Sequence, residues 1–148
     1  MSQTYTDIIM KSQKILTIDA DYNLSENVVK FIVENYGQYF SSEKLNFQIN
    51  MVVDEIFGNI AKYAFNNEGG KVNILSWMEE NPLRLNIKFV DNGVPFNPLE
   101  LEEPDITSSL DNRRIGGLGI YIVKNMVDSF VYKYIHKCNV LTITKILT

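Results

Sequence analysis

Residues 83–91 read LRLNIKFVD, and this stretch gives the clearest indication of the fold. Every second residue from Leu83 to Phe89 is apolar, and the residues between them up to Lys88 are polar, which is typical of a strand with one buried face. Asp91 follows with the same parity as the apolar residues. The pattern therefore predicts a carboxylate that points inward at the end of this strand.

The sequence on both sides of this strand predicts one α/β domain that spans residues 1–148. Helical spacing follows Ser25, a predicted N-cap, and stops near Gly37. A second helix is predicted from about residue 42 to 65, and a third from the glycines at 116–119 to about 129. The remaining predicted elements are strands at 8–18, 71–78, 130–136 and 140–147.

Composition excludes several classes of protein. The chain has 148 residues, of which 45% are hydrophobic, and this is enough for a packed core. Its net charge of -4 and the lack of a basic cluster argue against nucleic-acid binding. The N-terminus resembles no signal peptide, and no apolar run is long enough to cross a bilayer. With its single cysteine, Cys138, the chain is expected to be cytoplasmic and to have no membrane partner.

The inward Asp91 begins the motif Asp91-Asn92-Gly93. A buried carboxylate is costly unless it has a committed partner, and the exocyclic amine of a bound base would be one. Gly93 would allow a ligand to approach the backbone closely. The alternative is a turn that ends the strand, because Asn-Gly is a strong turn signal. The turn explains Asn92 and Gly93 but not the parity of Asp91.

On the second helix, Glu55, Asn59 and Lys62 form one polar stripe at i, i+4 and i+7. Carboxylate and carboxamide oxygens suit Mg²⁺, and a glutamate can act as a general base. Taken alone, the stripe fits an ordinary solvated helix face better than a functional site.

The third motif is Gly116-Gly117-Leu118-Gly119-Ile120, which opens the third helix. Free backbone N–H groups and the helix dipole attract phosphate at such a position. The alternative is a flexible turn that leads into the helix. The motif is neither a Walker A sequence nor a Rossmann fingerprint.

Together, the three motifs resemble those of the GHKL ATPase superfamily. Residues 55–64 resemble its N-box, 91–98 its first glycine box and 117–123 its second. The tail from Val127 to Lys145 is similar to the closing hairpin of the short anti-sigma-factor kinases. Tyr63 and Asn97 depart from the usual His and Asp. The resemblance implies a two-layer α+β sandwich, the Bergerat fold, with helices on one face of a mixed, mostly antiparallel sheet.

The resemblance also implies ATP and Mg²⁺ as cofactors and a role for each matched residue. Asn59 matches the Mg²⁺-binding asparagine, Glu55 the catalytic base and Asp91 the residue that reads the adenine amino group. The other nucleotide contacts that it implies are Lys62, Gly93, Gly117, Leu118, Gly119 and Ile120. Residues 91–114 show no regular period, which is typical of a lid or binding loop, and Arg114 lies at the end of this expected lid, where a cation could meet the terminal phosphates.

The function implied by this resemblance is that of an anti-sigma-factor serine kinase. Such a protein phosphorylates a serine on an antagonist of STAS fold, binds a sigma factor and forms a homodimer. A histidine kinase is excluded because the single histidine, His136, lies near the C-terminus and is expected on the surface. The alternative is a non-catalytic module that switches a partner through ATP-dependent ordering of its lid.

Overall fold

The computed structural model describes residues 13–66, 68–100 and 118–148. The elements in chain order are β1 (Lys14–Asp19), η1 (Tyr22–Leu24), α2 (Ser25–Tyr36), η2 (Gly37–Tyr39), α3 (Glu43–Asn59), a π-helical segment (Ile60–Ala64), β2 (Lys71–Glu79), β3 (Arg84–Asp91), η4 (Pro98–Glu100), α4 (Leu118–Met126), β4 (Ser129–Ile135) and β5 (Cys138–Ile146).

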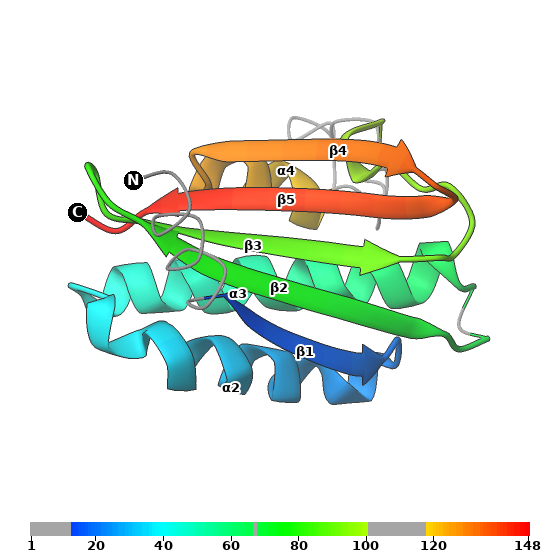
Figure 1. The fold of residues 1–148 in the computed structure, drawn as a ribbon, viewed down its shortest axis with the longest axis horizontal. Helices are drawn as coiled ribbons and strands as arrows, with labels where there is room; N and C mark the ends of the chain where they lie inside the picture. Colours follow the sequence, from blue (N-terminus) through cyan, green and yellow to red (C-terminus); the bar gives the residue numbers. More distant parts are fainter. Residues whose placement is uncertain (1–12, 67, 101–117) are drawn as a thin grey trace, which may run out of the picture.

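The strands form one sheet in the order β1-β2-β3-β5-β4, and all four pairings are antiparallel. Helices α2, α3 and α4 lie behind the sheet in Figure 1, so they cover a single face. The predicted two-layer α+β arrangement is therefore confirmed. The sheet is antiparallel throughout, where a mixed sheet was expected.

The alternation in residues 83–91 is confirmed by burial. Leu85, Ile87 and Phe89 are each at most 2% exposed, and Asp91 is 4% exposed on the same face. Full burial of such an apolar side chain contributes about 1.5–3 kcal/mol. Helix α3 packs on this face through a fully buried stripe that includes Val53 and Ile56. This packing fixes the position of α3 relative to β3, the strand that ends in Asp91.

Several boundaries differ from the prediction. Ser25 is the first residue of α2 and not its cap, because its hydroxyl donates a hydrogen bond to the Asp54 carboxylate. Ser42 does cap α3, where its side chain accepts from the Leu45 N–H. Helix α4 ends at Met126 instead of near 129, because Ser129 already begins β4. In the first predicted strand, residues 8–12 lie outside the described residues.

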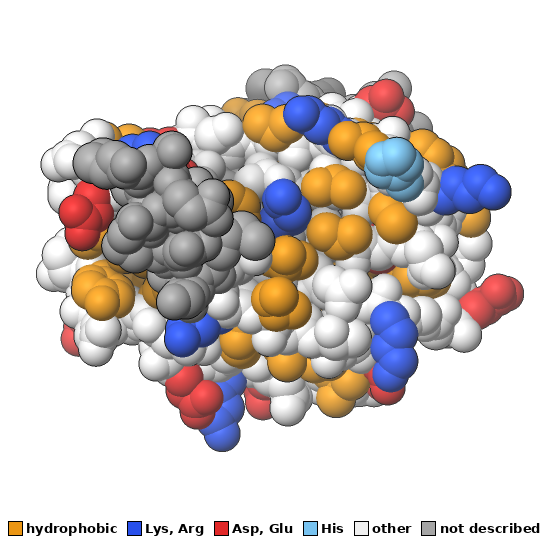
Figure 2. All heavy atoms as spheres, viewed as in Figure 1, with side chains coloured by type: hydrophobic (Ala, Val, Ile, Leu, Met, Phe, Trp, Pro, Cys, Tyr) orange, Lys and Arg blue, Asp and Glu red, His pale blue; other side chains and the backbone are white. Residues whose placement is uncertain are grey.

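The sheet face that lies away from the helices carries apolar side chains among polar ones. Figure 2 views the molecule from this side, and hydrophobic side chains are scattered across the strands. Ile15, Val131 and Ile135 are 60%, 44% and 44% exposed. His136, in the β4–β5 turn, is also exposed, as expected. Among the described residues, no helix is long and apolar enough to cross a membrane.

Candidate nucleotide site

The Asp91 carboxylate lies buried at the end of β3. Its Oδ1 accepts hydrogen bonds from the Gly93 N–H and from Asn139 Nδ2, both at 2.9 Å. Among the described contacts, Oδ2 accepts none. Burial raises the pKa of Asp91 above its usual range, and the two hydrogen bonds oppose that rise. One carboxylate oxygen therefore anchors the turn, and the other remains available to a ligand.

Asn139, on β5, links Asp91 to the loop that follows β3. Its Nδ2 also donates to the Val94 carbonyl at 2.9 Å, and its Oδ1 accepts from the Phe96 N–H at 2.9 Å. The Tyr132 hydroxyl donates to the same Oδ1 at 2.5 Å. We did not predict this role, although Asn139 shares the parity of Leu141 and Ile143 and is therefore an inward position. That parity was the signal in the sequence that could have revealed it.

Gly93 allows the loop to pack directly against the end of the π-helical segment. The Val94 N–H donates to the Ala64 carbonyl at 2.9 Å. A Cβ atom built on Gly93 would overlap the same carbonyl oxygen. Because the group it meets is backbone, the chain itself would have to move to admit a side chain. Glycine is thus required here by the approach of two backbones.

We expect Gly93→Ala to lower the free energy of unfolding by about 1–3 kcal/mol, because the added methyl group overpacks this contact. Urea denaturation monitored by circular dichroism measures the change. Val94→Ala is the matched control, since Val94 is 52% exposed and its substitution leaves the Ala64 contact intact. Equal stability of the two variants would contradict the steric argument.

Glu55 and Asn59 lie together on α3, one turn apart. Asn59 Nδ2 donates to the Glu55 carbonyl at 2.7 Å and to Glu55 Oε1 at 3.1 Å. Because the amide nitrogen makes both bonds, Asn59 Oδ1 is the atom left for a cation. Asn59 is buried at 9% exposure, which holds this geometry in place.

The Glu55 carboxylate also lies against the first turn of α4. A Cβ atom built on Gly119 would overlap Glu55 Oε1. A side chain at position 119 would therefore occupy the position of the carboxylate. The positive end of the α4 dipole favours a negative group at this point. This contact brings the polar stripe of α3 and the glycine motif of α4 together.

Both predicted glycine motifs contact the remaining predicted motif, residues 55–64. Glu55 meets Gly119 near the end of α3, and Ala64 meets Gly93 and Val94 about two turns later. Asp91 is the first residue of the glycine box that contains Gly93 and Val94. Segments far apart in the sequence thus contact α3 and the π-helical segment that follows it.

The remaining predicted contacts have different surroundings. Lys62 is exposed and its ammonium lies 5.0 Å from the centre of the Tyr63 ring, which stacks on Phe96 at 4.8 Å. Lys62 lies in the π-helical segment, so the regular stripe with Glu55 and Asn59 is interrupted before it. Leu118 is half-buried and Ile120 is 3% exposed. Arg114 and Gly117 lie outside the described residues.

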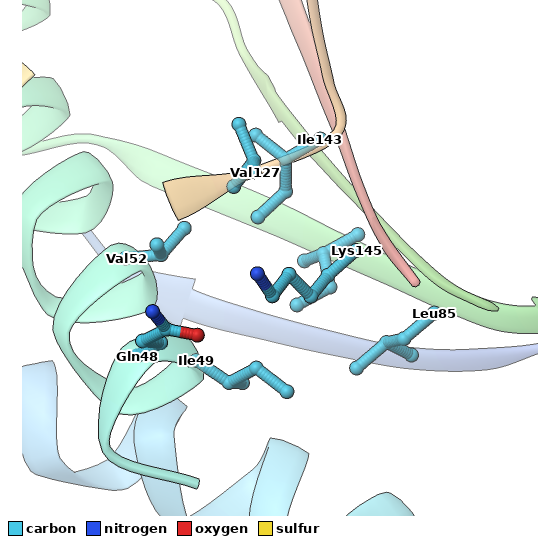
Figure 3. Close-up of a pocket in the computed structure, with 8 residues that line it drawn as sticks. Gln48, Ile49, Val52, Leu85, Val127, Ile143 and Lys145 are labelled. Carbon is cyan, nitrogen blue, oxygen red and sulfur yellow. The ribbon is translucent and has the colours of Figure 1, made fainter. Parts of the chain in front are cut away.

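A separate cavity lies between the first half of α3 and the sheet. It is lined mostly by apolar side chains, including Ile49, Val52 and Leu85, together with Gln48 and Lys145 (Figure 3). Its volume is about 10 Å³, which is roughly enough to hold one water molecule. The Lys145 ammonium donates to the Met126 carbonyl. This void is a packing defect and is too small for a nucleotide.

Comparison with known proteins identifies the family of the chain. The family model described as "Histidine kinase-like ATPase domain" matches residues 18–145. The chain belongs to the histidine kinase-like ATPase family. The resemblance to the GHKL superfamily, which rested on the three motifs, is thereby confirmed.

Relatives in this family include protein kinases. The chain is 26% identical over 103 residues to the serine/threonine-protein kinase BtrW of Bordetella bronchiseptica, covering 70% of this chain and 72% of BtrW. It is 29% identical over 84 residues to the serine-protein kinase RsbW of Bacillus mycoides, covering 54% of this chain and 51% of that protein. The chain thus spans about half the length of RsbW.

Two solved structures share the fold. One holds the RsbU and RsbW domains of Rv1364c from Mycobacterium tuberculosis, with a TM-score of 0.59 at 14% identity, covering 90% of this chain and 32% of that one. The other is the catalytic domain of the histidine kinase ThkA, with a TM-score of 0.50 at 15% identity, covering 91% of this chain and 98% of that domain. At these identities the likeness concerns the fold alone.

The residues present fit the ATP that this family implies. Asp91 offers a buried acceptor oxygen without a protein partner among the described residues, which suits the amino group of a base. Asn59 directs Oδ1 away from its two hydrogen bonds, and an amide oxygen is a ligand that Mg²⁺ accepts. Gly119 leaves room for the Glu55 carboxylate at the first turn of α4. The donor set therefore matches a magnesium nucleotide.

Proposed function

We propose that this protein is an ATP- and Mg²⁺-dependent protein-serine kinase of the anti-sigma-factor type. The single observation that carries the proposal is the position of the Glu55 carboxylate, which lies between Asn59 and the first turn of α4. A candidate base thus lies next to the candidate metal ligand and next to the end of α4 where phosphates would bind. The kinase relatives BtrW and RsbW support the same reaction class.

Each residue would have a defined task. Asp91 would accept a hydrogen bond from the adenine amino group, with Asn139 and Gly93 holding its other oxygen. Asn59 would bind Mg²⁺ through Oδ1. The N–H groups at residues 117–120 would face the phosphates, and Arg114 and Lys62 would supply positive charge. Bound ATP supplies the phosphoryl group, and Mg²⁺ offsets its charge.

Glu55 would accept the proton of the attacking serine hydroxyl. The hydrogen bond from Asn59 Nδ2 orients its carboxylate, and this leaves the second oxygen for the hydroxyl. Orientation of this kind is an important part of phosphoryl-transfer catalysis, because little other covalent chemistry is required of the protein. The protein would thus contribute positioning and one proton acceptor.

The substrate would be a small antagonist protein of STAS fold, and a sigma factor would be the second partner. We place both, and a homodimer of this chain, in the cytoplasm. The Mycobacterium tuberculosis protein with a similar fold carries RsbU and RsbW domains together, and RsbW is also the name of serine-protein kinases related to this chain. The proposed kinase would thus regulate a sigma factor together with its antagonist protein.

Incubation with γ-labelled ATP tests the proposal. The purified chain is mixed with a small protein that co-purifies with it from the native host, and the label is located by mass spectrometry. A labelled serine on that protein is expected, and chelation of Mg²⁺ should abolish the labelling. Tight ATP binding without any transfer would instead favour a non-catalytic switch.

Gly119→Ala should separate folding from phosphotransfer. The new methyl group displaces the flexible end of Glu55, which costs little stability, and alanine in a helix is favoured over glycine by up to about 1 kcal/mol. We therefore expect an equal or higher melting temperature with transfer reduced at least about tenfold. Calorimetry and the labelling assay measure the two effects. A variant with the full transfer rate would contradict the role of this contact.

A further inference from the structure

A groove of about 630 Å³ runs between α2 and α3, on surfaces of the two helices that the nucleotide site does not use. Its walls come from Glu26, Val29, Lys30 and Val33 of α2 and from Phe47, Asn50, Met51 and Asp54 of α3. Both sets follow the spacing i, i+3, i+4 and i+7. Each helix therefore presents one continuous stripe, and the groove is straight over about two helical turns, or roughly 10 Å.

The two ends of the groove differ in chemistry. Because Ser25 of α2 donates a hydrogen bond to Asp54 of α3, the start of α2 lies beside the later part of α3. Glu26 and Asp54 therefore form an acidic end. The opposite end is formed by Val33 and Phe47, and Phe47 is 63% exposed.

The wall of the groove contains an unsatisfied acceptor. Asn50 Oδ1 is buried and has no hydrogen-bond partner among the described residues. Lys30 also lines the groove, but its ammonium pairs with Glu34 at 3.8 Å. The groove thus combines an apolar end with an acidic end.

We propose that this groove binds an amphipathic helix of a partner protein, with a basic side chain of that helix at the acidic end. Two parallel ridges with i, i+3, i+4 and i+7 spacing accept a third helix by ridge-into-groove packing. A basic side chain would pair with Glu26 and Asp54, and apolar residues would pack on Phe47 and Met51. The proposal deepens the proposed function, on which it rests for the partner being a protein.

The position of the acidic end connects the groove with the nucleotide site. Asp54 and Glu55 are neighbours in α3, and Asp54 lines the groove while Glu55 contacts Gly119. A helix bound in the groove would therefore place the rest of its protein beside the candidate base. The groove would orient a protein substrate or a protein inhibitor relative to the site.

The probe is a short fluorescein-labelled helical peptide with leucines along one face and an arginine at one end. Its anisotropy is measured with the full chain without nucleotide, so a failure of the kinase proposal does not affect the result. We expect the peptide to bind, and a matched peptide with glutamate in place of arginine to bind at least about tenfold more weakly. Equal binding of both peptides would overturn the proposal.

Variants locate the binding surface. Phe47→Ser and Glu26→Lys should each weaken binding about tenfold, because both side chains are exposed and line the groove. Val131→Ser on the sheet and Glu80→Lys in the exposed β2–β3 turn are the matched controls and should bind normally. Sedimentation identifies a competing occupant: if Phe47→Ser converts a dimer to a monomer, the groove is a contact between copies of this chain and the proposal fails.

Discussion

Asp91→Asn is expected to reduce ATP affinity by at least about 100-fold, since a polar ligand group that loses its buried partner is strongly disfavoured. The free carboxylate oxygen would be replaced by an NH₂ group, and two donors would then face each other. Isothermal titration calorimetry measures the loss. Asp19→Asn serves as the control, because Asp19 is exposed and its ion pair with Lys71 lies on the surface.

The same substitution should leave the fold intact. The asparagine carbonyl can still accept hydrogen bonds from the Gly93 N–H and from Asn139 Nδ2. Burial raises the pKa of Asp91 in the folded state, so the ionised carboxylate opposes folding at neutral pH. We therefore expect Asp91→Asn to match or exceed the wild-type melting temperature at pH 7. Unchanged ATP affinity would show that Asp91 does not read the base.

The raised pKa of Asp91 also predicts how the stability of the protein depends on pH. Because the folded-state pKa is above the unfolded value, the stabilisation from protonated Asp91 is fully present at low pH and is lost as pH rises through the folded-state pKa. The stability of the wild type relative to Asp91→Asn should therefore improve as the pH falls from neutral toward the ordinary pKa of an aspartate, about 4. Urea denaturation of both proteins at several pH values measures the difference.

The sequence was most informative where the apolar residues recur at a regular spacing and that face of the element is buried. The alternation from Leu83 to Phe89 predicted both the strand and the inward carboxylate, because one face of an antiparallel sheet is buried. Helix α3 was equally clear, since its apolar residues recur every three or four positions. These two elements place Asp91 and Asn59, so much of the candidate site follows from local patterns.

Other features depend on contacts that no local pattern records. The π-helical segment at Ile60–Ala64 continues a regular apolar spacing, and its wider turn is associated with the packing of Ala64 on Gly93 and Val94. Ser25 resembled a cap but bonds to Asp54, which is distant in sequence. The contact of Glu55 with Gly119 likewise requires two helices to be placed relative to each other.

Glu55→Gln is expected to preserve ATP binding and to slow phosphotransfer by about 10²–10⁴-fold, the usual contribution of a general base. Glutamine has the size of glutamate, and its Oε1 can still accept from Asn59 Nδ2. Only the capacity to take a proton is lost. Single-turnover labelling measures transfer, and calorimetry measures binding.

Glu43→Gln is the matched control for this variant, because Glu43 lies on the same helix and is exposed in its first turn. Its transfer rate should equal that of the wild type. If Glu55→Gln also transferred at the wild-type rate, the carboxylate would act only as a structural acceptor for Asn59. If Glu55→Gln lost ATP affinity as well, Glu55 would belong to the metal site instead. Slow transfer with intact binding is the one result that assigns Glu55 the role of base, because it separates proton acceptance from the geometry that Asn59 and Gly119 define.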